Sequence, residues 1–473
     1  MGRSGGGARG AKENMKLTFH GGAKAVTGAN YLLESDPSAS SGQAKILIDC
    51  GLRQGLRYCE PVNFKPFPYE PSTILAVFIT HAHIDHIGRL PLLYRKGFRG
   101  KVYSTPPTKD FAQELLLDSE KILANEARDC GEEPMYGVEE VEGLMSLWET
   151  VSYHKTVEVN GWEAELYNAG HILGSSLILI TETKSGKKII FSGDLGNPTT
   201  PFITKTDKTP AADYAVMEST YGGRIHEVER ARKDELENII EETIKAGGIL
   251  MIPAFALERT QELLFELNEL VENGRIPRVP IFIDSPLAIR LTVIYKKYLN
   301  DPAYFNGEAM GLLKRGDAIF DFPGLKLTLT TEESKEINNV PSPKIIIAGS
   351  GMSQGGRILH HEKRYLGDPK NTLLIIGYQA GDSLGRQILN GAKKVKIMGE
   401  EIRVQAKVKA IGGYSAHADQ PALLDWVAPM RANLKEVFLV QGEEDQMIPL
   451  KQKIQDELAV SAKIPEAGEE VIL

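Results

Sequence analysis

This sequence has few cysteines, no long hydrophobic run and no excess of positive charge. No uninterrupted apolar segment approaches the roughly 20 residues needed to cross a bilayer, and no signal-peptide core lies near the start. We therefore expect a cytoplasmic protein that does not enter membranes. The three cysteines among 473 residues, Cys50, Cys59 and Cys130, form no CxxC pair. Their number and spacing favour a reducing compartment with buried or incidental thiols.

The charge balance excludes a broadly basic protein. Lys and Arg total 55 against 63 for Asp and Glu, which gives a net charge of -8 and a pI near 5.8. Proteins with a wide nucleic-acid-binding face usually carry a basic domain. Any nucleic-acid substrate of this chain must therefore be held by a local basic groove and by metal ions.

Length and pattern predict two domains, because 473 residues exceed one usual core. Residues 1–14 are Gly-rich and basic, so we expect a disordered leader or tag there. From 15 to 220 short β-type runs end in Gly, Asp or Ser, with helices expected at 108–128 and 137–150. From 221 to 400 helices alternate with buried strands, which favours a parallel sheet covered on both faces. Residues 401–473 return to the first pattern and the first domain.

The segment THAHIDH gathers His81, His83, Asp85 and His86 directly after the apolar run ILAVFI. On a helix, residues two apart point about 200° from each other, so His81 and His83 could not share an ion. At the end of a strand they can. Three imidazoles and a carboxylate suit zinc, with manganese or iron as alternatives. A polar loop of locally hydrogen-bonded histidines is the much weaker alternative.

Two later segments have the same character. NAGHILGSS places His171 in a Gly-flanked turn, and FSGDLGN places Asp194 at the end of a strand. A carboxylate there can bridge two metals at the roughly 3.5–4 Å separation of binuclear hydrolases. Asp49 ends the strand KILID and is a candidate for a carboxylate that orients a ligand histidine. Each segment alone is weak evidence, but in this order after HxHxDH each becomes strong.

In combination, these motifs resemble a known family. HAHIDH, GHILGS and FSGDLG resemble the metallo-β-lactamase superfamily, and ESTYG, SAH and GGRILHH resemble its nucleic-acid-processing β-CASP branch. The run from 15 to about 446 is similar to bacterial and archaeal relatives of the cleavage and polyadenylation specificity factor endonuclease. The resemblance implies an α/β fold, an αββα metallo-β-lactamase sandwich with an inserted β-CASP α/β domain of mainly parallel sheet.

The same resemblance implies a ligand set and catalytic residues. It implies two Zn²⁺, with Mn²⁺ as an alternative: one on His81, His83 and His171, the other on Asp85 and His86, with Asp194 bridging. Glu218 matches the first β-CASP motif. His417 matches the second, where the histidine acts as general acid. The resulting catalytic candidates are Asp85, Glu218 and His417.

The chemistry agrees with these assignments. A hydroxide held between two divalent ions is a nucleophile at neutral pH, and the ions offset charge on a phosphate. A histidine near neutral pKa can give the leaving ribose oxygen its proton. Glu218 beside His417 would keep that histidine charged and aimed. We therefore expect a ribonuclease that cuts single-stranded RNA internally, with 5′-exonuclease activity as an addition.

Gln441, in EVFLVQGEED, departs from the family pattern. RNA-processing members carry a histidine there that completes the second zinc site, and DNA-processing members carry valine. The amide oxygen of Gln441 can ligate weakly, or a water can fill the position. Either arrangement predicts a weakened second metal site and attenuated activity.

The loop GSGMSQGGRILHH offers a weaker signal for substrate binding. A Gly-rich turn that opens a helix can present backbone N–H groups to a phosphate, so Ser350, Gly351 and Arg357 are candidate substrate contacts. Three other functions remain open: a small-ester or thioester hydrolase, a DNA nuclease, and a non-catalytic RNA-processing subunit. The inserted domain favours nucleic acid over small esters. The family also suggests a homodimer through the C-terminal segment.

Overall fold

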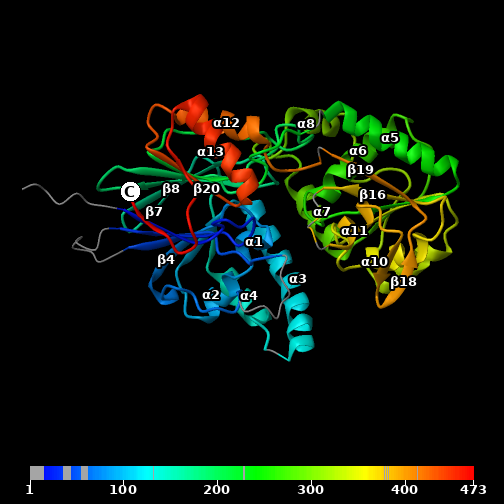
Figure 1. The fold of residues 1–473 in the computed structure, drawn as a ribbon, viewed down its shortest axis with the longest axis horizontal. Coiled ribbons are helices and arrows are strands. Elements are labelled where there is room, and N and C mark those ends of the chain that lie inside the picture. Colours follow the sequence, from blue (N-terminus) through cyan, green and yellow to red (C-terminus); the bar gives the residue numbers. More distant parts are fainter. Residues whose placement is uncertain are drawn as a thin grey trace, which may run out of the picture.

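The computed structural model describes residues 15–35, 44–54, 62–131, 133–226, 229–377, 379, 381, 383–412 and 414–473. These residues form two domains that lie side by side in Figure 1. The leader expected at 1–14 and Cys59 lie outside the described residues, whereas Cys50 is buried. None of the helices in the described part of the chain is both long and apolar enough to span a bilayer.

The first domain is a sandwich of two sheets. One has the strand order β22-β1-β2-β3-β4-β5-β6 and the other β21-β20-β11-β10-β9-β8-β7. The strands of the first sheet are β1 (Lys16–Gly21), β2 (Asn30–Glu34), β3 (Lys45–Ile48), β4 (Ile74–Phe78), β5 (Lys101–Ser104), β6 (Trp148–Thr150) and β22 (Glu470–Ile472). Those of the second are β7 (Thr156–Val159), β8 (Trp162–Asn168), β9 (Ser176–Glu182), β10 (Lys188–Phe191), β11 (Tyr214–Glu218), β20 (Glu436–Val440) and β21 (Ala462–Lys463).

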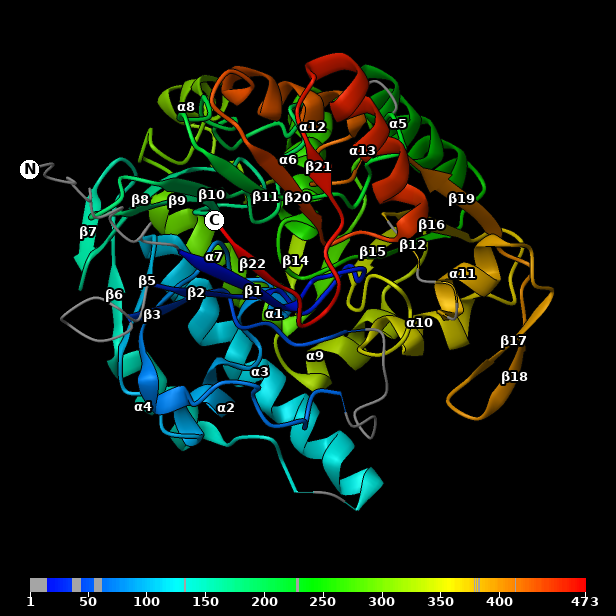
Figure 2. The same ribbon diagram turned by 60° about the vertical axis from the view of Figure 1, so that its left-hand side comes forward.

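Helices cover the outer faces of this sandwich, as Figure 2 shows. On one side are α1 (Ile84–Ile87), α2 (Leu90–Arg95), α3 (Pro106–Cys130) and α4 (Val138–Ser146), and on the other α12 (Gln420–Val427) and α13 (Glu444–Leu458). Between the sheets lies an apolar core that includes Phe19, Phe78, Phe191 and Phe438. This arrangement is the predicted αββα sandwich.

The second domain contains one six-stranded sheet of order β14-β13-β15-β12-β16-β19. All its strand pairs are parallel. The strands are β12 (Ile249–Pro253), β13 (Ile281–Asp284), β14 (Leu325–Leu327), β15 (Lys344–Ala348), β16 (Thr372–Ile376) and β19 (Lys407–Ile411). The strands β12, β15 and β16 are buried along their whole length, because helices cover both faces of a parallel sheet. The predicted parallel sheet is therefore confirmed.

The remaining elements of this domain surround the sheet. They are α5 (Glu229–Lys245), α6 (Arg259–Glu272), α7 (Pro286–Tyr298), α8 (Gly307–Lys314), α9 (Thr331–Glu336), α10 (Ile358–Tyr365), α11 (Leu384–Leu389) and the hairpin of β17 (Lys394–Ile397) and β18 (Glu400–Arg403). The helix α7 starts where the Ser285 side chain accepts from the Ala288 N–H, with proline at its first position.

Two features differ from the sequence-based expectation or extend it. The helix predicted at 137–150 ends at Ser146, and Trp148–Thr150 instead forms β6 beside β5. A helical pattern does not reveal that an available sheet edge will recruit the segment, so tertiary pairing overrides it here. The strand β19 lies past residue 400, yet it pairs with β16 of the second domain.

The topology brings distant segments to one place. The second domain is inserted between β11 and β20, which are parallel neighbours in the same sheet. Glu218 ends β11 and Gln441 directly follows β20. The two domains also touch through α3 and α7, where Arg290 pairs with Glu114 and the Tyr298 hydroxyl donates to Asp110. The insertion therefore connects the second domain to the end of the sandwich where β11 and β20 stop.

Candidate metal centre

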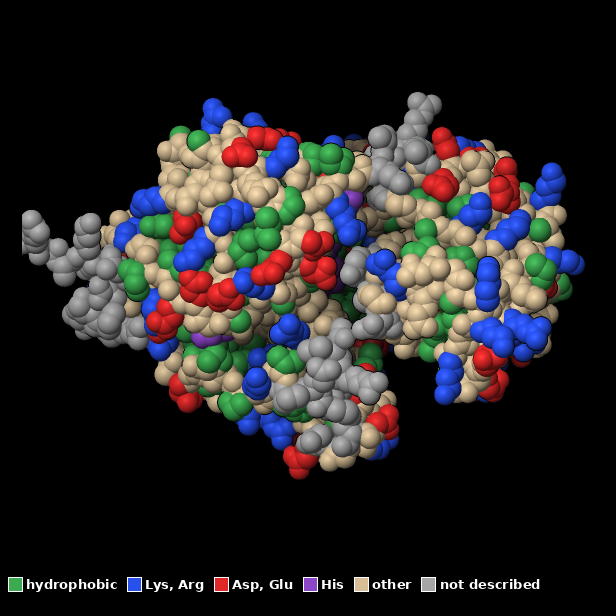
Figure 3. All heavy atoms as spheres, viewed as in Figure 1, with side chains coloured by type: hydrophobic (Ala, Val, Ile, Leu, Met, Phe, Trp, Pro, Cys, Tyr) green, Lys and Arg blue, Asp and Glu red, His purple; other side chains and the backbone are tan. Residues whose placement is uncertain are grey.

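The predicted histidines and carboxylates lie together at one end of the sandwich. His81 and His83 follow β4, His171 follows β8, and Asp194 follows β10. In the space-filling view, histidine side chains are visible in the hollow between the two domains (Figure 3). The cluster therefore lies where the strands β4, β8 and β10 end.

Four of these residues form one compact set of ligand atoms. One ligand atom from each of His81, His83, His171 and Asp194 lies within 4.8 Å of all the others. His83 Nδ1 lies 3.0 Å from His81 Nε2 and 3.3 Å from His171 Nε2. Asp194 Oδ2 lies 3.3 Å from His81 Nε2 and 3.5 Å from His171 Nε2. Three imidazoles and one carboxylate in such a group fit a tetrahedral zinc ion.

Burial keeps two of these histidines in the neutral form that a metal ligand needs. His81 and His171 are buried, as is Asp194. Burial lowers the pKa of His83 and of His171 well below the usual value near 6.5. Both rings are therefore neutral and present lone pairs, which a metal ion requires. His171 Nδ1 lies 3.2 Å from the Ala416 carbonyl oxygen, so this nitrogen donates and Nε2 faces the cluster.

A second group of predicted residues lies on the other side of Asp194. His86 Nε2 is 3.3 Å from Asp194 Oδ1 and 3.8 Å from Asp85 Oδ2. Asp194 thus directs one carboxylate oxygen to each group, which is the arrangement of a bridging carboxylate. Asp49 Oδ2 lies 2.7 Å from His86 Nδ1 and accepts from the Thr80 hydroxyl at 2.8 Å. The carboxylate predicted to orient a ligand histidine therefore contacts His86, one of the predicted ligands.

The group of Asp85, His86 and Asp194 fits a metal ion less well than the cluster of three histidines and Asp194. The side-chain amide nitrogen of Gln441 lies 2.9 Å from His86 Nε2 and 2.9 Å from Asp194 Oδ1. An amide N–H is a donor and cannot ligate a cation. The two atoms that would hold a second ion therefore face hydrogen-bond donors.

His417 and Glu218 form a pair beside the cluster. His417 Nδ1 lies 3.1 Å from both carboxylate oxygens of Glu218, and its Nε2 lies 3.9 Å from Asp194 Oδ2. Glu218 is fully buried and accepts from the Leu195 N–H at 2.6 Å. Burial alone would lower the pKa of His417, but Glu218 and Asp194 outweigh it and raise that pKa to about 9. The imidazole is therefore cationic at neutral pH.

The candidate substrate contacts on the Gly-rich loop lie elsewhere. Arg357 donates to Asp284 Oδ1 at 2.7 Å and to the carbonyl oxygens of Thr328 and Leu329 at 3.0 Å each. The Ser350 hydroxyl accepts from the backbone of the same loop, and a Cβ at Gly351 would meet the Phe255 ring. No contact between described residues joins these groups to the histidines, so their role in substrate binding stays a prediction.

Two residues at the centre were missed by the sequence reasoning. Thr80, beside His81, donates its backbone N–H and its hydroxyl to Asp49. The position of Thr80 directly before HxHxDH was the sequence signal that could have identified it as part of the site. Tyr31 is buried, and its hydroxyl lies 3.5 Å from Gln441 Oε1. Nothing in the surrounding sequence VTGANYLLE marks this tyrosine as part of the site.

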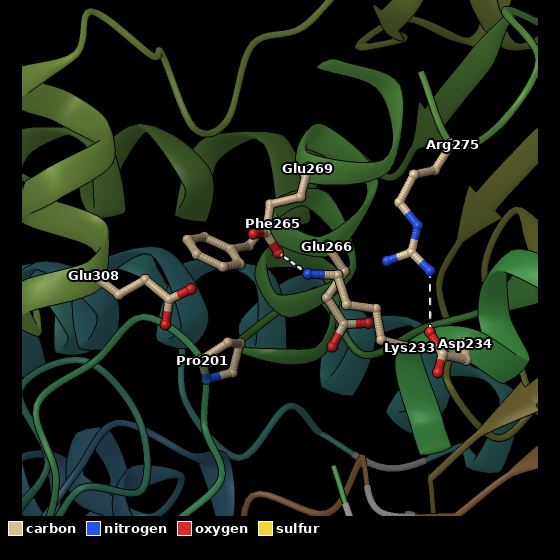
Figure 4. Close-up of a pocket in the computed structure, with 8 residues that line it drawn as sticks. All are labelled: Pro201, Lys233, Asp234, Phe265, Glu266, Glu269, Arg275 and Glu308. Atoms are coloured by element: carbon tan, nitrogen blue, oxygen red, sulfur yellow. Dashed lines mark hydrogen bonds and ion pairs between the residues drawn. The ribbon is translucent and has the colours of Figure 1, made fainter. Parts of the chain in front are cut away.

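A separate cavity of about 360 Å³ lies along α5, α6 and α8 (Figure 4). It is lined by Pro201, Lys233, Asp234, Phe265, Glu266, Glu269, Arg275 and Glu308. Lys233 pairs with Glu269, and Arg275 pairs with Asp234 at 3.0 Å. None of the predicted site residues lines this cavity.

Three family models match the chain. Residues 40–200 match the metallo-beta-lactamase superfamily domain, and residues 260–388 match the Beta-Casp domain. Residues 401–465 match the Zn-dependent metallo-hydrolase RNA specificity domain. A crystal structure of a protein of unknown function from Enterococcus faecalis V583 has a TM-score of 0.55 at 14% identity, covering 97% of this chain and 100% of that chain. This last similarity shows the fold alone.

Curated relatives match over nearly the whole chain. Ribonuclease TTHA0252 of Thermus thermophilus is 37% identical over 92% of this chain and 95% of its own length. Transcription termination factor FttA is 32% identical in Thermococcus kodakarensis and 31% identical in Methanosarcina mazei, each over 95% of this chain and 70% of its own length. With its αββα sandwich and inserted parallel sheet, the chain belongs to the β-CASP branch of the metallo-β-lactamase superfamily.

Proposed function

We propose that this protein is a metal-dependent ribonuclease that hydrolyses phosphodiester bonds of single-stranded RNA. One observation carries the proposal: the His81, His83, His171 and Asp194 cluster adjoins the His417–Glu218 pair through Asp194. A metal centre and a positioned acid are the two parts that phosphodiester hydrolysis needs. The names of the ribonuclease and termination-factor relatives, and the RNA specificity domain at 401–465, support RNA as the substrate.

The residues take distinct roles in this proposal. His81, His83, His171 and Asp194 hold a divalent ion, zinc by the ligand set and manganese as an alternative. When bound, the ion acidifies a water nucleophile and offsets the negative charge that develops on the phosphate. Asp85 lies beside His86 and can accept a proton. The sequence-based prediction of a second zinc, more weakly held, rests on Asp85, His86 and Asp194.

His417 supplies the proton that the leaving oxygen requires. Its Nδ1 is held by Glu218, so Nε2 is the atom that faces the cluster and gives up the proton. The buried carboxylate fixes the ring and keeps it charged. We propose a single strand rather than a duplex as the substrate. We propose internal cleavage with 5′-exonuclease activity in addition, and the homodimer remains a prediction.

The proposal is tested with a 5′-labelled single-stranded RNA, zinc or manganese, and the Asp194→Ala variant. We expect a ladder of internal products that Asp194→Ala abolishes. Asp425→Ala, an exposed aspartate on α12, is the matched control and should cleave like the parent chain. Equal cleavage by Asp194→Ala would refute the proposal. Single-stranded DNA and a thioester substrate test the two other hydrolase classes.

Gln441 favours a second candidate, a non-catalytic RNA-processing subunit. Its amide nitrogen contacts both groups that a second ion would need. Such a subunit would bind the labelled RNA without cutting it, while Gln441→His would restore cleavage. Cleavage by the parent chain excludes this candidate.

A further inference from the structure

We infer that the side-chain amide of Gln441 replaces the second metal ion, so that this protein has a one-ion centre. The inference rests on the metal site of the proposed function but not on the identity of the substrate. It follows from four relationships around Gln441: its contacts with Asp194, with His86, with Tyr31 and with the backbone around Gly22.

Asp194 fixes the orientation of the amide. Gln441 places one terminal atom 2.9 Å from Asp194 Oδ1. A carboxylate oxygen only accepts hydrogen bonds, so the atom that faces it must be the amide nitrogen. The amide oxygen then faces the buried Tyr31 hydroxyl at 3.5 Å, which is a donor. Both neighbours therefore favour the same orientation, with the N–H groups directed into the second position.

The same amide nitrogen also lies against His86. Asp49 Oδ2 lies 2.7 Å from His86 Nδ1, so Nε2 is the ring atom that faces the second position. The Gln441 nitrogen lies 2.9 Å from this Nε2 atom. The amide therefore lies between the two atoms, His86 Nε2 and Asp194 Oδ1, that a second ion would need.

The surrounding backbone prevents the amide from withdrawing. Gln441 is buried and has a φ of 49°, a left-handed conformation that is costly for a residue other than glycine. Its N–H donates to the Gly22 carbonyl at 2.7 Å, and its carbonyl accepts from the Thr220 hydroxyl at 3.0 Å. A Cβ on Gly22 would lie 2.5 Å from the Tyr31 hydroxyl and 3.3 Å from Gln441 Cγ. The backbone of Gln441 is therefore fixed at two points, and its buried side chain packs beside Gly22.

The first metal position remains intact. Gln441 contacts the Oδ1 atom of Asp194, whereas Oδ2 faces His81 and His171. A neutral amide also brings no positive charge to the far side of Asp194. The protein should therefore hold one ion firmly at His81, His83, His171 and Asp194, with no comparable second ion.

The test is the metal stoichiometry of the full chain, measured without RNA. Metal-stripped protein is dialysed against Zn²⁺ or Mn²⁺, bound metal is quantified by elemental analysis, and the Mn²⁺ form is studied by electron paramagnetic resonance. We expect one equivalent and no exchange-coupled Mn²⁺ pair. Gln441→Glu has the same size but replaces the N–H groups with a ligand oxygen. Gln441→His introduces an imidazole. Each should bind a second equivalent and show the coupled signal.

The outcomes separate this inference from the proposed function. Two equivalents on the parent chain, with affinities within about tenfold and a coupled Mn²⁺ signal, would overturn the one-ion centre and leave the nuclease proposal standing. Failure of both Gln441→Glu and Gln441→His to gain an ion, with unchanged thermal melting, would also overturn it. Absence of any bound metal on the parent chain would overturn the metal centre of the proposed function itself.

Discussion

His417 Nδ1 lies 3.1 Å from both carboxylate oxygens of Glu218, although 199 positions separate the two residues in the chain. Glu218 ends a strand of the sandwich, and His417 follows the last strand of the inserted domain's sheet. The loop after β10 holds His417 in place, because Gly196 forms an isolated β-bridge with it and Asn197 N–H donates to the Ala416 carbonyl at 2.7 Å. The pair therefore joins the end of β11 to a segment that the sandwich itself anchors.

The first prediction concerns the charge of Glu218. Gln in its place can still accept a hydrogen bond from His417 but cannot stabilise the imidazolium. We expect Glu218→Gln to lower single-turnover RNA cleavage by about 100-fold, within the usual range for general acid catalysis. Metal content should not change, and Glu149→Gln, an exposed glutamate on β6, should cleave normally. Loss of metal by Glu218→Gln would contradict this role.

The pH profile gives a second test of the same pair. Glu218 and Asp194 raise the pKa of His417 to about 9 against the effect of burial. An acid acts only while protonated, so activity should fall as pH rises through that pKa. Removing the charge of Glu218 lowers the pKa, and the alkaline limb of the Glu218→Gln profile should move to lower pH. An unmoved limb would exclude His417 as the acid.

His83 and His86 should differ in their effect on metal binding. His83 Nδ1 belongs to the compact cluster, whereas His86 Nε2 contacts the Gln441 amide. His83→Ala should therefore lose nearly all bound zinc, while His86→Ala should retain it. Elemental analysis of both variants after dialysis checks this prediction. Equal loss from the two would show that both histidines hold the same ion.

Asp284 should be important for stability. Its buried carboxylate accepts from Arg357, the Thr328 and Ser334 hydroxyls and the His361 ring, each at 2.7 Å. Asp284→Ala would leave the Arg357 charge without its carboxylate partner, and breaking a buried pair typically costs about 3–5 kcal/mol. Thermal melting should show a clear decrease in Tm, whereas Asp425→Ala should melt like the parent chain. A Tm within a degree of the parent's would be inconsistent with this network.

Glu362 should make stability depend on pH. Burial raises the pKa of this carboxyl on α10 to about 8, despite the hydrogen bond from Ser353. Between the unfolded value of about 4.3 and 8, the folded protein keeps a proton that the unfolded chain releases. Stability should therefore fall as pH rises through this window, by up to about 4 kcal/mol between pH 5 and 8.

Glu362→Gln removes the ionisation and nearly preserves the shape. Its free energy of unfolding should be similar to that of the parent chain at pH 5 and higher at pH 8. Urea denaturation at the two pH values measures the difference. If the unfolding free energies of the variant and the parent chain differ by the same amount at pH 5 and at pH 8, Glu362 does not titrate in this window.

Much of the fold and of the cluster could be predicted from the sequence. HxHxDH after an apolar run predicted a metal site at His81 and His83, because ligand types at that density rarely occur without an ion. The structure brings both side chains together with His171 and Asp194, and their role as ligands stays a prediction. The buried runs at β12, β15 and β16 predicted a parallel sheet, since only strands covered on both faces are apolar throughout.

The remainder depends on relationships that no local pattern contains. The strand β19 resembles the strands of the first domain in sequence, yet it pairs with β16, and nothing in its residues specifies a partner. The departure from the family pattern at Gln441 was visible in the sequence, but the orientation of its side-chain amide was not. Only the positions of Asp194 and Tyr31 show that the amide nitrogen faces the second site.

The most direct test of the central claim is zinc-dependent cleavage by metal-stripped protein. An internally labelled single-stranded RNA is incubated under single-turnover conditions with stripped protein and with increasing zinc, beside the His83→Ala variant. We predict no cleavage by the stripped protein, cleavage that rises in proportion to bound zinc, and no recovery in His83→Ala at matched concentrations. Full cleavage after stripping, or full recovery in His83→Ala, would contradict a ribonuclease that acts through this metal centre.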